Sequence, residues 1–200
     1  MKRYTVKLTD DFKQAEVGRI EESPWDYALP PKTEFRAIRG EEALKIQLKC
    51  YEEDPVARID RRHGPVCNDS CMEFFFSPCS DCSLGYFNFE VNSNPTYLFD
   101  YGPDSGDGRF HIDADEELDV KAERGEDETG KYWQIAASFP FEFIKRYAPG
   151  ADFSHGAVIR ANVYKCGKTD QLEHYASWSP VGTPGPNFHM PEFFGEFALE

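Results

Sequence analysis

The sequence predicts an all-β protein, a β-sandwich of about ten antiparallel strands with one short helix. Short runs rich in Phe, Tyr, Val and Ile recur at nearly regular spacing and are separated by turn residues. They do not alternate with long helical segments, which argues against a βαβ arrangement. The 200 residues, of which 40% are hydrophobic and 15% aromatic, are enough to build one core. We therefore expect a single domain over residues 1–200.

Each predicted strand is a short run with apolar side chains at alternate positions or throughout. In one of them Phe87, Phe89 and Val91 point to one face and the polar residues between them point to the other. The predicted strands are residues 3–8, 34–39, 43–51, 69–78, 85–94, 96–102, 117–124, 131–139, 156–165, 173–178 and 194–199. Short turns such as residues 40–42 join several of them, so we expect hairpins packed as an immunoglobulin-like or jelly-roll-like sandwich.

Three further segments complete the chain. Residues 140–150 predict the one helix, because a Pro fits the first turn and a Pro-Gly pair ends it. Residues 179–187 are rich in Pro and Gly and predict a long connection, and loops of this kind on a β scaffold often carry binding residues. Gly195, among the four Phe of residues 186–200, predicts a turn into a last buried strand.

The net charge of −14 limits the partners that the protein can have. A phosphate backbone or an anionic membrane surface would be repelled, so we expect neither nucleic acid nor a membrane as partner. Half of the excess lies in residues 113–128, which we interpret as a solvated hairpin face, with calcium binding as the alternative. The first residues contain no apolar signal region, so we expect a cytoplasmic protein, or a secreted one only if a signal has been removed.

Six cysteines are present, and four of them lie close together in the sequence. Cys79 and Cys82 have the spacing of a metal or redox motif, and with Cys67 and Cys71 they could form a four-thiolate zinc site. We favour free, reduced thiols, because the segment is typical of a hairpin tip and no helix follows it. The spacing leaves open whether Cys79 and Cys82 pair or bind metal.

The sequence contains no catalytic motif, and we do not expect an enzyme. Serine-nucleophile, zinc-protease, phosphate-loop and dinucleotide patterns are absent, and the five His have no ligand spacing. Asp100, Asp104 and Asp107 only loosely resemble a calcium loop, so we predict a turn there, with calcium as the alternative. Binding requires only a shaped aromatic surface and a few planar hydrogen-bonding groups, and the chain has both.

Three stretches, taken in order, resemble carbohydrate-binding module family nine and its free-standing relatives. They are CNDSCMEFFFSP (67–78), YFNFEVNSNP (86–95) and HYASWSPVGTPGPNFHMPEFFGEFALE (174–200), and RIEESPWDY (19–27) fits more weakly. The resemblance spans nearly the whole chain, and its C-terminal motif is the most specific. It implies a β-sandwich that binds sugar-chain ends or small sugars without catalysis, with structural calcium in the characterised xylanase modules.

The resemblance also implies where the site lies and how it differs from the family pattern. In those modules two Trp rings clamp the sugar; here one falls at Val66 or Cys67 and the other at Phe188. One ring is therefore lost, and the other is smaller than an indole. Glu90 stands where the modules carry a basic residue. The predicted sugar-binding residues are Phe188, Glu73, Asn92, His63, His189 and Trp178.

Three of these residues also have a purely structural interpretation. Phe188 would stack on the sugar or plug its own loop, and His63 would bond a hydroxyl or sit in a solvated loop. Trp178 ends a strand and fits the core better than a platform, as do Trp25 and Trp133.

Two other functions stay open. A protein-interaction sandwich without a sugar site predicts an exposed apolar patch. A xylanase-type hydrolase domain predicts two carboxylates facing each other across a cleft, within about 10 Å.

Overall fold

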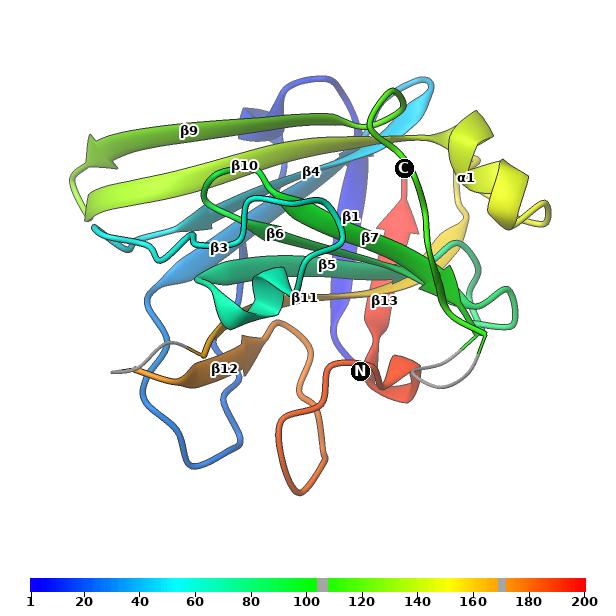
Figure 1. Cartoon of the computed structure of the whole chain (residues 1–200). Coiled ribbons are helices and arrows are strands. Elements are labelled where there is room, and N and C mark those ends of the chain that lie inside the picture. The colour runs from blue at the N-terminus through cyan, green and yellow to red at the C-terminus, as the bar shows by residue number, and fades with distance from the viewer. Residues whose placement is uncertain (104–107, 169–171) are drawn as a thin grey trace.

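The computed structural model describes residues 1–103, 108–168 and 172–200 and confirms a mostly β architecture with one α-helix (Figure 1). The strands are β1 Arg3–Leu8, β2 Gly18–Arg19, β3 Thr33–Arg39, β4 Ala43–Cys50, β5 Cys71–Ser77, β6 Tyr86–Asn92, β7 Tyr97–Gly102, β8 Phe110–His111, β9 Asp119–Asp127, β10 Gly130–Pro140, β11 Val158–Gly167, β12 His174–Ser177 and β13 Gly195–Leu199. The helices are α1 Phe141–Tyr147 and the short 3₁₀ turns η1 Phe12–Gln14, η2 Val66–Asn68 and η3 Pro191–Phe193. None of the described helices has the length and hydrophobicity that a membrane span requires.

The strands form one sheet that curls until its two halves face each other. Its order is β8-β7-β6-β5-β11-β13-β1-β3-β4-β10-β9, with β12 beside β11 and β2 beside β3. In Figure 1, β9, β10 and β4 form the upper layer and β5, β6, β7 and β11 the lower one. The sheet passes from one layer to the other through β1, which pairs first with β13 and then with β3.

Both pairings of β1 are parallel, whereas the sequence predicts antiparallel strands throughout. The physical reason is that β1 is not joined to either neighbour by a hairpin turn. A tight turn forces antiparallel pairing, but a strand inserted between distant segments is free to take either direction.

The core lies between the two layers and is rich in Phe. Phe74, Phe76, Phe89 and Phe139 belong to it and are fully buried. A second apolar cluster covers the outer face of the β5–β6–β11 layer and includes Phe75. This explains the run of three Phe in β5, because the strand is buried on both faces.

The acidic segment runs along β9, an exposed edge strand, and the residues on either side of it, as predicted for a solvated hairpin face. All six cysteines are free, and the described residues group Cys71 with Glu73 and Cys166 instead of with Cys79 and Cys82. The four-thiolate zinc interpretation is therefore not borne out. The loose calcium loop falls on residues 104–107, outside the described residues.

Candidate functional site

A cleft of about 210 Å³ lies on the outer face of β5, β6 and β11. The strands supply its floor, β12 supplies one wall, and the loop before η3 folds over it. Its lining residues are Cys67, Glu73, Glu90, Cys166, Lys168, Tyr175, Pro186, Asn187, Phe188 and His189. The floor side chains are polar although the strands are buried, because they belong to the alternate positions that point away from the Phe-rich core.

Two carboxyl groups form the centre of the floor. Glu73 on β5 lies directly opposite Glu90 on β6, and their side chains are only 2% and 6% exposed. Paired residues of this kind have Cβ atoms about 4.5–5.5 Å apart. Burial raises the pKa of Glu90 to about 7 and raises that of Glu73 well above its usual range. Near neutral pH the floor therefore offers both carboxylate acceptors and a carboxyl O–H donor.

A chain of hydrogen bonds fixes the orientation of Glu90. Asn88 Nδ2 donates to Glu90 Oε1 over 3.0 Å. Arg109 donates in turn to Asn88 Oδ1, and its guanidinium lies 4.1 Å from the centroid of the Tyr86 ring. The carboxyl of Glu90 is thus held by a defined partner within the floor.

Aromatic rings form the walls. Phe188 stacks on Tyr164, with ring centroids 4.2 Å apart and planes inclined by 13°, and meets Tyr175 edge to face at 6.1 Å. Only 8% of Phe188 is exposed. Phe188 therefore plugs its own loop and also lines the cleft, so the two interpretations of this residue describe one arrangement.

His189 closes the cleft beside Phe188. Its Nδ1 lies 2.8 Å from the Tyr86 hydroxyl, and its ring packs on Phe75 with centroids 4.9 Å apart. Burial and, to a lesser extent, the nearby Arg109 lower the pKa of His189 to about 4. The imidazole is therefore neutral at physiological pH and can both accept and donate a hydrogen bond.

The structure brings Phe188, Glu73 and His189 together, but Asn92 lies outside the cleft. Asn92 is fully buried, and its Nδ2 donates to Ile59 O over 2.8 Å and to Asp69 Oδ2 over 2.9 Å. Its Oδ1 accepts from the backbone N–H groups of Asn94 and Thr96. These bonds occupy the whole amide, which holds two loops together.

Trp178 and His63 also lie outside the cleft. Trp178 packs in the main core, 5.3 Å from the ring of Phe197, in a space left open by Gly195. His63 stacks on His111, over the β7–β8 edge of the same layer. Of the other two tryptophans, Trp133 belongs to the main core and Trp25 to the outer cluster.

Seven of the ten lining residues are absent from the predicted sugar-binding set: Cys67, Glu90, Cys166, Lys168, Tyr175, Pro186 and Asn187. The family resemblance names the positions of Cys67 and Glu90, but only as a lost ring and a lost basic residue. The alternation of β6 already places Glu90 on the polar face. That it meets Glu73 depends on the register between β5 and β6, which the alternation does not give.

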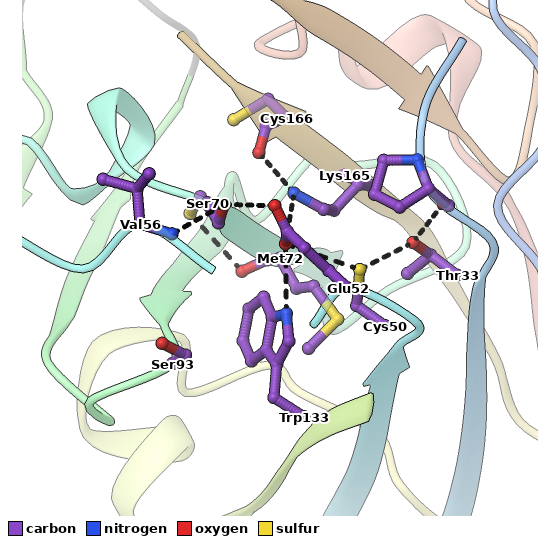
Figure 2. Close-up of polar contacts among 12 residues, drawn as sticks. Thr33, Cys50, Glu52, Val56, Ser70, Met72, Ser93, Trp133, Lys165 and Cys166 are labelled. Carbon is purple, nitrogen blue, oxygen red and sulfur yellow. Dashed lines mark hydrogen bonds and ion pairs between the residues drawn. The ribbon is translucent and has the colours of Figure 1, made fainter. Parts of the chain in front are cut away.

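A second hollow of about 490 Å³ lies under the segment between β4 and β5. It is lined by Leu29, Pro31, Tyr51, Glu52, Asp54, Val56, Arg58, Ser70, Leu172 and His174. Figure 2 shows the polar cluster that includes Glu52. Glu52 accepts from Ser70 Oγ over 2.7 Å and from Trp133 Nε1 over 3.2 Å, and the buried Lys165 Nζ lies 3.8 Å away. Because Glu52 is engaged within the protein, this cluster ties the segment to the sandwich, and we favour the smaller cleft as the site.

Comparisons with known proteins point to one family. The model of carbohydrate-binding family 9 matches residues 5–199. A crystal structure of a candidate carbohydrate-binding protein from Bacteroides uniformis is similar, with 26% identity and a TM-score of 0.84 over 100% of this chain and 99% of that one. A family 9 module from Caldicellulosiruptor kristjanssonii shares the fold in two structures. Its complex with glucose has 13% identity and a TM-score of 0.69 over 100% of this chain and 96% of that one. Its complex with cellotriose has 12% identity and a TM-score of 0.70 over 100% of this chain and 94% of that one. No curated protein matches.

Proposed function

This chain belongs to carbohydrate-binding family 9, and from that premise we propose that the cleft over β5, β6 and β11 is where it binds a sugar. The observation that carries the proposal is the pair of buried carboxyls, Glu73 and Glu90, at the floor of an aromatic-walled cleft. Buried carboxyls are unfavourable unless they have partners. The hydroxyl groups of a sugar would be such partners, because each can both donate and accept a hydrogen bond.

The size of the cleft favours a single ring. Its 210 Å³ is smaller than the roughly 300–1,000 Å³ of sites for drug-sized ligands. A chain end would enter with one sugar and leave the next in solvent, past the exposed Lys168 and Asn187. The relatives that share the fold hold glucose and cellotriose, so we propose glucose or the end of a short glucan as the ligand class.

The ligand would be held by contacts of two kinds. Carboxyl oxygens of Glu73 and Glu90 would bond neighbouring hydroxyls, and charge-assisted bonds are the stronger ones. The exposed parts of Phe188 and Tyr175 would contact the C–H face of the ring. Since Phe188 is nearly covered by its neighbours, the polar floor contributes more of the affinity than it would in a two-ring clamp.

We propose binding without hydrolysis. A glycosidase places its two carboxyl groups on either side of the scissile bond, at separations of about 5–9.5 Å. Glu73 and Glu90 instead lie side by side on adjacent strands, beneath the ligand. They can bond the same sugar, but neither lies on the far side of a bond to attack it.

The experiment is isothermal titration of the full chain with glucose, cellobiose and cellotriose, with and without calcium. Glu90→Gln should weaken binding roughly five- to tenfold, because a hydrogen bond to a charged group contributes about 1.5–3 kcal/mol against about 0.5–1.5 for a neutral one. Glu116→Gln, on an exposed residue outside the cleft, is the matched control and should bind like the natural protein.

Two outcomes would overturn the proposal. In the first, Glu90→Gln binds sugar as tightly as Glu116→Gln and the natural protein do, which would show that the binding site lies elsewhere. The other is no heat at tens of millimolar sugar from a folded protein. That result would favour a protein-docking role, for which the exposed Leu29 and Leu172 at the rim of the second hollow are the natural place to look.

A further inference from the structure

Three side chains that are distant in the sequence converge beside β7. His63 comes from the segment before η2, Asp100 from β7 and His111 from β8. Each offers one ligand atom, and these atoms all lie within 4.8 Å of one another. The sequence shows no ligand spacing among its histidines, so only the fold brings this group together.

The strands and the segment before η2 each fix part of the group. Asp100 and His111 are opposite residues of the antiparallel β7–β8 pair, and His111 Nδ1 lies 2.6 Å from Asp100 Oδ1. The His63 ring lies over the His111 ring, with centroids 4.6 Å apart and planes inclined by 23°. The carboxylate therefore already contacts one imidazole, and the second imidazole lies against the first.

A second observation indicates that the group lacks a partner. His63 Nδ1 is buried and has no hydrogen-bond partner among the described residues. Buried polar atoms are normally satisfied, and an unsatisfied one costs about 1–3 kcal/mol. His63 also has a φ of 56°, in the left-handed region, where non-glycine residues are uncommon and tend to occur at functional sites.

The neighbouring contacts keep His63 in that conformation. Its backbone N–H donates to Tyr97 O over 3.3 Å. The guanidinium of Arg62 lies 3.7 Å from the centroid of the Tyr97 ring, and Arg62 Nε is 2.5 Å from Asp115 Oδ1. The imidazole is thus held at the edge of β7 by contacts on the residue before it.

We propose that His63, Asp100 and His111 form a site for a borderline divalent metal ion, with Zn²⁺ as the best fit. Two imidazoles and one carboxylate are a common donor set for zinc, which leaves a fourth position for water. Calcium is excluded as the natural ion, because it prefers oxygen ligands in larger number. Two nitrogens bound to one zinc lie at most about 4 Å apart, so donors within 4.8 Å need to close by less than about 1 Å, and the stacked rings need to turn so that both lone pairs point at the ion.

The site would join the segment before η2 to the β7–β8 edge of the lower layer. Asp100 is opposite Asn88 on β6, the residue that holds Glu90, so the ion would lie on the same face as the cleft but would share no lining residue with it. Metal binding would stabilise the folded chain by mass action.

The competing thiol group has to be separated in the experiment. Cys71, Glu73 and Cys166 also have ligand atoms within 4.8 Å of one another, and all three are buried. Thiolates select soft metals, whereas imidazole and carboxylate suit borderline ones. A cobalt spectrum distinguishes the two, because only thiolate ligation adds a strong sulfur-to-metal charge-transfer absorption.

The test is titration of the full, tag-free, metal-stripped protein with ZnCl₂, followed by the absorption spectrum of the Co²⁺ form. We expect one ion per chain and no thiolate absorption. His111→Ala and His63→Asn should each weaken zinc binding at least about tenfold, since even outer-shell partners contribute about 10–100-fold. Asn is chosen at position 63 because it tolerates a positive φ. His155→Ala, on an exposed histidine outside the group, should leave binding unchanged.

The proposal fails if zinc does not bind in the millimolar range while the protein is folded. It also fails if binding survives both His63→Asn and His111→Ala. Thiolate absorption that disappears in Cys166→Ser would place the ion in the thiol group instead and would equally overturn the assignment.

Discussion

Replacing Glu90 with Gln should make the protein more stable at alkaline pH while weakening its affinity for sugar. Burial raises the pKa of Glu90 from its ordinary 4.5 to about 7. Between these two values the native state holds more protons than the unfolded chain, so the free energy of unfolding falls as the pH rises. Below about 4.5 both states are protonated and the effect vanishes; above about 7 it is complete.

The magnitude follows from the difference between the two pKa values. At about 1.36 kcal/mol per pKa unit, ionised Glu90 costs about 3 kcal/mol of stability above pH 7. This is an upper figure, because the cleft admits water that relieves part of the burial cost. Gln has the shape of Glu without the charge and can still accept from Asn88, so Glu90→Gln should recover most of that free energy.

The assay is urea unfolding of the natural protein, Glu90→Gln and the exposed control Glu116→Gln, between about pH 4 and pH 8. The free energy of unfolding of Glu90→Gln should equal that of the natural protein near pH 4. The difference should grow between about pH 4.5 and pH 7 and level off above neutrality. Glu116→Gln should follow the natural protein throughout. An advantage that does not depend on pH, or a Glu90→Gln protein that is less stable at pH 8, would refute the assignment of Glu90 as a buried acid.

Two further substitutions test the placement of residues outside the cleft, each by urea unfolding. Gly195→Ala should lower the free energy of unfolding by about 1–3 kcal/mol, because its Cβ would lie 2.4 Å from the buried Trp178 ring and 2.8 Å from Lys2 O; an unchanged midpoint would show that the ring can move. Asn92→Ala should lower the free energy of unfolding by more than about 2 kcal/mol, because Asp69 and three backbone groups each lose a hydrogen-bond partner. It should leave the affinity for sugar unchanged. A loss of affinity without a loss of stability would show that Asn92 belongs to the site.

The sequence predicts eleven of the thirteen described strands, because each is a short run of alternating or continuous apolar residues bounded by turn residues. The two-residue strands β2 and β8 carry no such pattern. The direction in which a strand pairs and the identity of its neighbours in the sheet are harder to predict. Strand β1 pairs in parallel with β13 and β3, and nothing in residues 3–8 specifies those distant partners. Aromatic content alone also does not show which of the two apolar clusters a residue joins. Phe75 and Phe76 are adjacent in one strand, yet they belong to clusters on opposite faces.

The candidate site is predictable only where a motif carries it. Glu73 and Phe188 follow from the family resemblance, and the structure places both in the cleft. The pairing of Glu90 with Glu73 depends on the register of β5 against β6, and the His63–His111 contact depends on how the segment before η2 packs on β7. Such relations arise from tertiary packing, which residue spacing does not encode.

The position of β1 also determines how the protein responds to mechanical force. In Figure 1, β1 and β13 run side by side with the two chain ends at opposite ends of the pair. Tension between residues 1 and 200 therefore slides the two strands along each other. Their hydrogen bonds are loaded together and must break at once, whereas strands peeled from one end release their bonds singly. A domain built this way should therefore unfold at high force when it is pulled by residues 1 and 200.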